Sequence, residues 1–156
     1  MGNAIYQGKC FRASKGNSEA PHIFTLTSKN PIEGFQPYDD IFYKEIHANE
    51  LDDYYEFDYF PIVKEQRCQI MQVKIEENSM MIVHSGYELN KYYEPEHVFD
   101  QSDFVYVIPI KDASRFIMEV YRFEKPDYRK YIGKEIFDYS YEEFMESYRK
   151  EVLERA

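Results

Sequence analysis

Carboxylates and one imidazole lie close together in residues 94–103, where Glu-Pro-Glu-His is followed by Asp100 and Asp103. Side chains of these types could hold a divalent ion or transfer protons. The spacing lacks the central glycine and the regularly placed ligands of an EF-hand loop, and the proline favours a turn. Cys10 and Cys68 stand alone, without the clustered ligands of a zinc site. The sequence therefore predicts no metal site and no cofactor.

Three short motifs that contain an arginine, a serine and a glutamate follow one another along the chain. Arg12 lies in Phe-Arg-Ala-Ser, Ser28 ends Phe-Thr-Leu-Thr-Ser, and Glu96 ends Glu-Pro-Glu. Their order resembles the Arg, Ser-Thr-Ser and Glu-x-Glu motifs of ADP-ribosyltransferases, with threonine at the first position of the serine motif. The resemblance implies that Arg12 and Ser28 organise an NAD dinucleotide and that Glu96 orients its ribose for transfer. A small enzyme of this kind, using NAD, is the catalytic alternative.

Motifs of the common enzyme classes are absent from the sequence. It contains no glycine-rich phosphate loop, no G-x-S-x-G elbow, no H-E-x-x-H and no C-x-x-C. His22, His47 and His84 lie far apart in the chain, and we expect each at a strand end or a turn. No catalytic residue is therefore predicted outside the ADP-ribosyltransferase-like alternative, and a non-catalytic function is favoured.

The densest mixture of acids and aromatic rings is the stretch Leu51–Phe60, which reads Leu-Asp-Asp-Tyr-Tyr-Glu-Phe-Asp-Tyr-Phe. In a strand, alternation would place Tyr55 and Tyr59 on one side and Glu56 and Asp58 on the other. Side chains two residues apart on a strand are separated by about 6.6 Å, so the carboxylates would form a row. We expect a half-buried strand with an acidic outer face.

Three interpretations of this acidic stretch remain open. It could be a solvated face, a protein-binding face, or an imitation of a nucleic-acid backbone, which carries a charge about every 3.4 Å per strand. In a binding face the carboxylates would attract the partner and the tyrosine rings would anchor it. Tyr55 and Tyr59 could instead face the core, which would leave Tyr54 as the exposed ring. The predicted partner-binding residues are Asp39, Asp40, Asp52, Asp53, Tyr54, Tyr55, Glu56, Asp58 and Tyr59.

Short runs rich in β-branched and aromatic residues dominate the chain. His22–Thr27 alternates as a strand does, and Phe104–Ile110 is apolar on both sides, as in an interior strand. Gln66–Ile75 and Ser79–His84 are predicted to form a hairpin around a polar turn. Tyr87–Tyr93 fits a short helix. The expected fold class is α+β, with a mostly antiparallel sheet of hairpins and one domain spanning residues 1–156.

The end of the chain carries the clearest helix signal. Ser140 and Glu143 have the spacing of a capping box at a helix start. Apolar residues then recur at helical intervals, which predicts a C-terminal amphipathic helix packed on the sheet. These residues are Tyr141, Phe144, Met145, Tyr148 and Val152.

Charge and composition indicate what the protein could bind. The 156 residues carry a net charge of −10 and include 16 tyrosines, and residues 38–60 contain eight acidic side chains against one lysine. Such a surface repels nucleic acid and anionic membranes and attracts basic proteins. No apolar run is long enough to span a membrane, and we expect a cytoplasmic protein. We predict an inhibitor or immunity-type protein that masks a basic, nucleic-acid-handling surface of a partner, and the oligomeric state stays open.

Overall fold

The computed structural model describes residues 1–156, and they group into two compact units. Unit 1 comprises Met1–Phe57, Val120–Glu135 and Glu146–Ala156, and unit 2 comprises Asp58–Glu119 and Ile136–Met145. Two such units can belong to one domain, so the expectation of a single domain over residues 1–156 stays a prediction.

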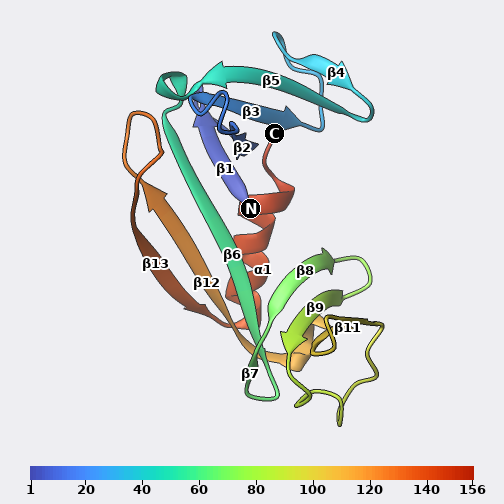
Figure 1. Cartoon of the computed structure of the whole chain (residues 1–156). Helices are drawn as coiled ribbons and strands as arrows, with labels where there is room; N and C mark the ends of the chain where they lie inside the picture. Colours follow the sequence, from blue (N-terminus) through green and yellow to red (C-terminus); the bar gives the residue numbers. More distant parts are fainter. The chain divides into compact units, whose positions relative to one another are not determined.

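The strands vary in length from two to eleven residues (Figure 1). Unit 1 contains β1 (Gly2–Tyr6), β2 (Lys9–Lys15), β3 (Ile23–Ser28), β4 (Gln36–Tyr38), β5 (Ile41–His47) and the helical turns η1 (Ala48–Glu50) and η3 (Arg149–Leu153). Unit 2 contains β7 (Gln66–Arg67), β8 (Gln69–Lys74), β9 (Ser79–Ser85), β10 (His97–Phe99), β11 (Asp103–Pro109) and the turn η2 (Ile110–Asp112). Residues of both units occur in β6 (Asp53–Val63), β12 (Ala113–Phe123), β13 (Tyr131–Tyr139) and helix α1 (Tyr141–Tyr148).

The strands form two sheets. One has the order β13-β12-β6-β1-β2-β3-β5-β4, with β7 paired to β6, and the other has the order β10-β11-β9-β8. Pairs such as β1 with β2, β2 with β3 and β9 with β11 are antiparallel. The predicted α+β class, with mostly antiparallel sheets and a C-terminal helix, is confirmed.

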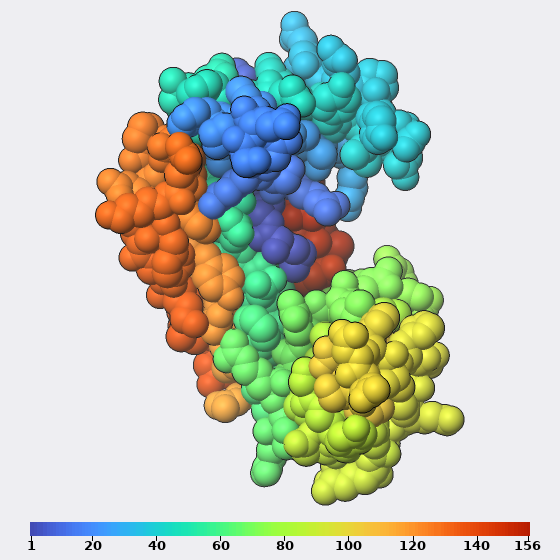
Figure 2. Space-filling view, viewed as in Figure 1, coloured from blue at the N-terminus to red at the C-terminus, as the bar shows by residue number.

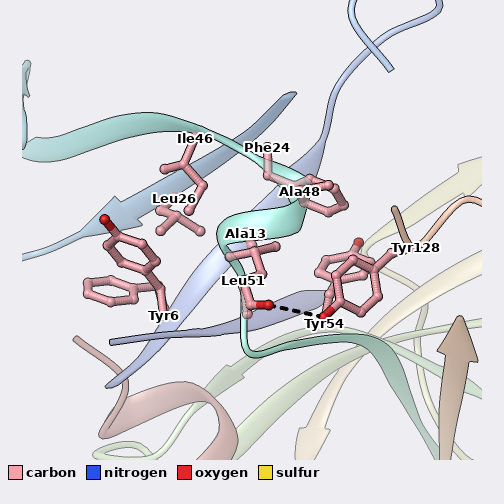
Figure 3. Packing of buried hydrophobic residues seen from close by; sticks show 11 residues of the cluster. Tyr6, Ala13, Phe24, Leu26, Ile46, Ala48, Leu51, Tyr54 and Tyr128 are labelled. Carbon is pink, nitrogen blue, oxygen red and sulfur yellow. Dashed lines mark hydrogen bonds between the residues drawn. The ribbon is translucent and has the colours of Figure 1, made fainter. Parts of the chain in front are cut away.

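The core of unit 1 lies on one face of its strands. In β2, Phe11 and Ala13 are buried while Arg12 and Ser14 are exposed, because successive side chains of a strand point to opposite faces. The Tyr128 hydroxyl donates a hydrogen bond to the Leu51 carbonyl oxygen at 3.4 Å, so this buried ring keeps a polar partner (Figure 3). The buried cluster consists of Ala4, Tyr6, Phe11, Ala13, Phe24, Leu26, Ile46, Ala48, Leu51, Tyr54 and Tyr128.

Strand β6 departs from the alternation expected for the acidic stretch. Phe57 and Tyr59 are buried, but so is Tyr54, whereas Tyr55 is half-buried. The Tyr54 ring packs edge-on against Phe24, with 4.8 Å between the ring centroids, and against Tyr128 at 5.9 Å. Because Tyr54 and Tyr59 are at most 3% exposed, neither can contact a partner. We therefore reassign both from predicted anchors to the core.

Helix α1 begins as its sequence predicts. The Ser140 backbone N–H donates to Glu143 Oε1 at 3.0 Å, and the Glu143 N–H donates to Ser140 Oγ at 3.2 Å. This reciprocal pair is the capping box. Phe144 is fully buried and stacks on Phe116 with 4.0 Å between the ring centroids and 9° between the ring planes.

The helix expected at Tyr87–Tyr93 is wrong, because this segment is a series of turns. The Asn90 N–H donates to the Tyr87 carbonyl at 3.1 Å, and the Tyr92 N–H donates to the Leu89 carbonyl at 3.0 Å. Leu89 is fully buried, and its neighbours on both sides are exposed. One buried side chain is enough to hold a turn but provides no apolar helical stripe.

Candidate functional site

Carboxylates of the predicted acidic strand are paired with cations of the same unit. Asp53 Oδ2 lies 3.5 Å from a guanidinium nitrogen of Arg122, and Glu56 Oε2 lies 3.3 Å from the Lys15 ammonium. These cations come from parts of the chain distant in sequence, β12 and β2. A carboxylate that already has an internal partner offers less charge to another protein.

Other predicted acids remain accessible. Asp39 and Asp40 are exposed in the turn between β4 and β5, and Asp52 is exposed just before β6. Tyr55, only half-buried, donates its hydroxyl to Glu151 Oε2 at 2.5 Å. Asp58 belongs to unit 2, whereas the other predicted binding residues, apart from Tyr59, belong to unit 1.

Net charge is distributed unevenly between the two units. Unit 1 has fifteen acidic and thirteen basic residues, so its formal charge is −2. Unit 2 has fourteen acidic and six basic residues, which gives −8. Residues 120–135 join unit 1 with five basic and three acidic side chains, so together with the basic residues near the start of the chain they offset part of the acidity of residues 38–57. Most of the net charge therefore belongs to unit 2.

Within unit 2, residues 87–100 place exposed rings beside exposed carboxylates. We call this part of the chain the 87–100 segment; it reaches the surface in Figure 2, where it is coloured yellow-green to yellow. Tyr87 is 65% exposed, Tyr92 51% and Phe99 49%. The exposed carboxylates of the segment are Glu88, Glu94, Glu96 and Asp100.

The 87–100 segment is held to unit 2 by backbone and ring contacts. The Glu96 N–H donates to the Val105 carbonyl at 2.8 Å, and β10 pairs with β11 as the outer strand of its sheet. The Tyr87 hydroxyl donates to the Gln101 carbonyl at 3.1 Å, and its ring meets Phe104 edge-on. These contacts fix the backbone while leaving the rings largely in solvent.

A buried histidine connects the 87–100 segment to β9. His84 Nε2 lies 3.1 Å from Glu88 Oε2, and His84 Nδ1 lies 3.3 Å from the Arg67 carbonyl oxygen. The pKa of Glu88 is lowered, first by a hydrogen bond with its own backbone and then by the bond with His84. Glu88 therefore stays ionised. The contacts of His84 with Glu88 and with the Arg67 carbonyl indicate a structural role for this histidine, which links β9 to the 87–100 segment.

A polar network in unit 1 was not predicted from the sequence. Asn3, fully buried, donates its amide to the Glu151 carbonyl at 2.8 Å and to Glu151 Oε2 at 3.1 Å, and Tyr55 donates to the same carboxylate. Arg155 donates from Nη1 to Asn3 Oδ1 at 2.9 Å. The pKa of Cys10 is raised, first by burial and then by Glu151. No local motif could reveal these contacts, because they join the two ends of the sequence.

A pocket of about 340 Å³ adjoins this network. It lies on the outward face of β2 and β3, where Arg12 pairs across the strands with Thr27. The pKa of Arg155 is lowered, first by burial and then by the neighbouring Arg12. The lining residues are Arg12, Ala13, Ser14, Thr25, Thr27, Ser28, Lys29, Ile41, Arg155 and Ala156.

The three residues of the ADP-ribosyltransferase-like alternative are divided between the units. Arg12 and Ser28 line the pocket of unit 1, whereas Glu96 belongs to the 87–100 segment of unit 2. Ser28 is buried, and its hydroxyl donates to the Asn30 carbonyl at 2.9 Å and accepts from the Asn30 N–H at 3.1 Å. Both hydrogen bonds of the hydroxyl thus close a turn. This arrangement does not favour the role that the resemblance implies for Ser28, which is to organise an NAD dinucleotide.

No group of three or more histidine, cysteine, aspartate or glutamate side chains is placed to hold a metal ion. None of the helices has the length and apolar character needed to cross a membrane.

Comparison with known proteins identifies one family. A family model described as "Uncharacterised conserved protein UCP033725" matches residues 3–119. The chain belongs to this family. The matched range includes Arg12, the acidic stretch and the whole 87–100 segment, but it ends before Glu151 and Arg155. No curated protein and no solved structure matches the chain.

Proposed function

We propose that the protein is a non-catalytic binding module that covers a basic surface of a partner protein. The observation that carries this proposal is the 87–100 segment, where three largely exposed rings alternate with four exposed carboxylates. Aromatic side chains are enriched at the centres of protein interfaces, and carboxylates attract and orient lysine and arginine. The formal charge of −8 on unit 2 would steer such a partner toward this segment.

Tyr92 already has cationic neighbours of its own. The ammonium groups of Lys64 and Lys91 lie 5.3 Å and 5.2 Å from the centroid of the Tyr92 ring. The ring therefore offers a partner apolar contact area, and the carboxylates of the 87–100 segment supply the attraction for basic side chains. The exposed Asp39, Asp40 and Asp52 of unit 1 would add to the overall negative charge that attracts such a partner.

The proposed action is that of an inhibitor or immunity-type protein. Clustered lysine and arginine are typical of nucleic-acid-handling surfaces, and a protein that covers them blocks access to nucleic acid. Rings interspersed among the carboxylates favour a protein contact over imitation of a nucleic-acid backbone, which requires a charge about every 3.4 Å. We place this action in the cytoplasm, a reducing compartment that suits the two free thiols of Cys10 and Cys68.

Two variants that each remove three negative charges test the proposal. The first, E94Q/E96Q/D100N, changes the 87–100 segment, and the matched control, D39N/D40N/D52N, changes unit 1. Binding to an immobilised arginine- and lysine-rich peptide is measured across a salt gradient. We expect the first variant to elute from the peptide at a much lower salt concentration than the unchanged protein. The control should elute at nearly the same salt concentration as the unchanged protein.

A third variant separates the rings from the charges. Tyr92→Ser combined with Phe99→Ser keeps every carboxylate and should still weaken binding, because the apolar contact is lost. If the two charge variants both eluted from the peptide at the same lowered salt concentration, net charge alone would govern binding. That result would overturn the proposal. Full binding by the ring variant would also contradict it.

A further inference from the structure

The pocket of unit 1 concentrates positive charge in an otherwise acidic protein. Arg12, Lys29 and Arg155 line it, and the α-carboxylate of Ala156 is the one anionic group among its lining residues. Burial, and after it the neighbouring charge of Arg12, lower the pKa of Arg155, whereas the nearby Glu151 acts in the opposite direction. Two guanidinium groups that line one cavity are stabilised when an anion binds there.

The position of Arg155 is fixed before any ligand binds. Its Nη1 donates to Oδ1 of the fully buried Asn3 at 2.9 Å. Asn3 is itself held by two hydrogen bonds to Glu151, and the Glu151 carboxylate also accepts from Tyr55. A side chain oriented by such a network loses little conformational freedom on binding.

Hydroxyl groups complete the donor set. Thr27 lies directly across the strands from Arg12, and Ser14 lies across from Thr25, so all four side chains share the outward face. Hydroxyls donate to anionic oxygens at little electrostatic cost. The Ala156 N–H donates to the Cys10 carbonyl at 2.9 Å, which holds the last residues beside β2 (Figure 1).

We propose that this pocket binds the phosphate group of a small phosphorylated ligand. Arg12 and Arg155 supply paired N–H donors that match phosphate oxygens, and Thr27 and Ser14 supply hydroxyls. A volume of about 340 Å³ exceeds that of a bare phosphate and lies at the low end of small-molecule sites, so part of the ligand beyond the phosphate also fits. Ile41 provides an apolar wall for that part. This site lies in unit 1 and does not depend on the proposed function of the 87–100 segment.

Calorimetric titration of the whole chain at low salt tests the proposal with inorganic phosphate, pyrophosphate, AMP and adenosine. We expect saturable binding of the three phosphate compounds and none of adenosine. Tighter binding of AMP than of inorganic phosphate would identify the source of the phosphate as a nucleotide-like ligand. Equal binding would identify free phosphate as the ligand.

Charge-matched variants localise the binding. Arg12→Gln should weaken it about tenfold or more, because a hydrogen bond to a charged group is lost. Lys9→Gln removes the same charge from an exposed position of β2 outside the pocket, and it should change binding by less than about twofold. Arg155→Lys keeps the charge but loses the paired donors, so it should also weaken binding. Glu96→Ala should leave phosphate binding unchanged.

Three results would overturn the proposal: no saturation below about 10 mM phosphate compound, equal weakening by Lys9→Gln and Arg12→Gln, or loss of binding in Glu96→Ala. Each variant is first compared with the unchanged protein in its unfolding midpoint without ligand. If Arg155→Lys fails to fold, the exposed Arg12 decides the question, because its side chain supports no buried contact described above.

Discussion

Two arginine–carboxylate pairs of unit 2 differ mainly in burial. Arg67 Nη2 lies 2.8 Å from Glu119 Oε1, and the Glu119 side chain is only 7% exposed. Arg115 lies 3.1 Å from Asp138, and both side chains of that pair are more than half exposed. Arg67→Ala should lower the free energy of unfolding by about 2–3 kcal/mol, because a buried carboxylate loses a charged donor. Arg115→Ala should cost less than about 1 kcal/mol. Urea unfolding of both variants measures the difference, and equal losses would contradict this explanation.

Single residues with local signals could be predicted from the sequence, and residues with remote partners could not. Ser140 and Glu143 lie three positions apart, and the capping box they form is visible in the spacing alone. Asn3 and Arg155 are chemically ordinary in the sequence, and only folding brings them into contact across 152 positions. The internal partners of the acidic stretch were hidden for the same reason: Lys15 and Arg122, which pair with Glu56 and Asp53, belong to other strands.

At the scale of the element, the start of helix α1 depends on its cap. Ser140→Ala removes the hydroxyl that accepts from the Glu143 N–H, so we expect a loss of about 1 kcal/mol in the free energy of unfolding. Glu142→Gln is the matched control, because Glu142 is exposed in the same turn and makes no cap contact; it should cost less than about 0.5 kcal/mol. Thermal unfolding followed by circular dichroism measures both, and a larger effect of Glu142→Gln would contradict the role of the cap.

Strands and helices could be predicted where the periodic pattern of apolar residues was long. The direction of individual side chains could not be predicted where the alternation of buried and exposed positions shifts along a strand. Antiparallel strands and the last helix follow from alternation and helical spacing. In β6 the buried positions pass from Tyr54 to Phe57, an interval of three, so strict alternation placed the wrong tyrosine inside. Tyr87–Tyr93 has the composition of a short helix, but Leu89 alone enters the core, and a single buried side chain permits turns.

At the scale of the whole molecule, charge is balanced in one unit and accumulated in the other. Each unit is built from separate segments of the chain, and the charges of those segments add up to −2 in unit 1 and −8 in unit 2. The net charge of −10 alone does not show this division. An acidic segment with exposed rings in unit 2 and a basic pocket in unit 1 can therefore exist in one chain. They would bind ligands of opposite charge without competing for the same side chains.

Six tyrosines with buried or half-buried rings give the whole molecule a common response to alkaline pH. Their pKa values are raised above the ordinary 10.0, in each case mainly by burial. Burial also raises the pKa of the Cys68 thiol to about 12. The tyrosines concerned are Tyr54, Tyr55, Tyr93, Tyr106, Tyr128 and Tyr148.

Because the folded state keeps these protons after the unfolded state has released them, unfolding is favoured as pH rises. These groups should leave stability unchanged from about pH 7 to pH 8. Stability should fall above about pH 9, where the Cys68 thiol of the unfolded chain ionises, and fall more steeply above about pH 10, where the unfolded tyrosines ionise. Urea midpoints measured against pH test this, together with phenolate absorbance of the folded and the urea-unfolded chain. Tyr54→Phe keeps the ring and removes one titrating hydroxyl, so its stability should fall less steeply above about pH 10. Coincident phenolate curves for the folded and unfolded chain would contradict the expected alkaline loss, since they would show that the buried hydroxyls titrate as they do in water.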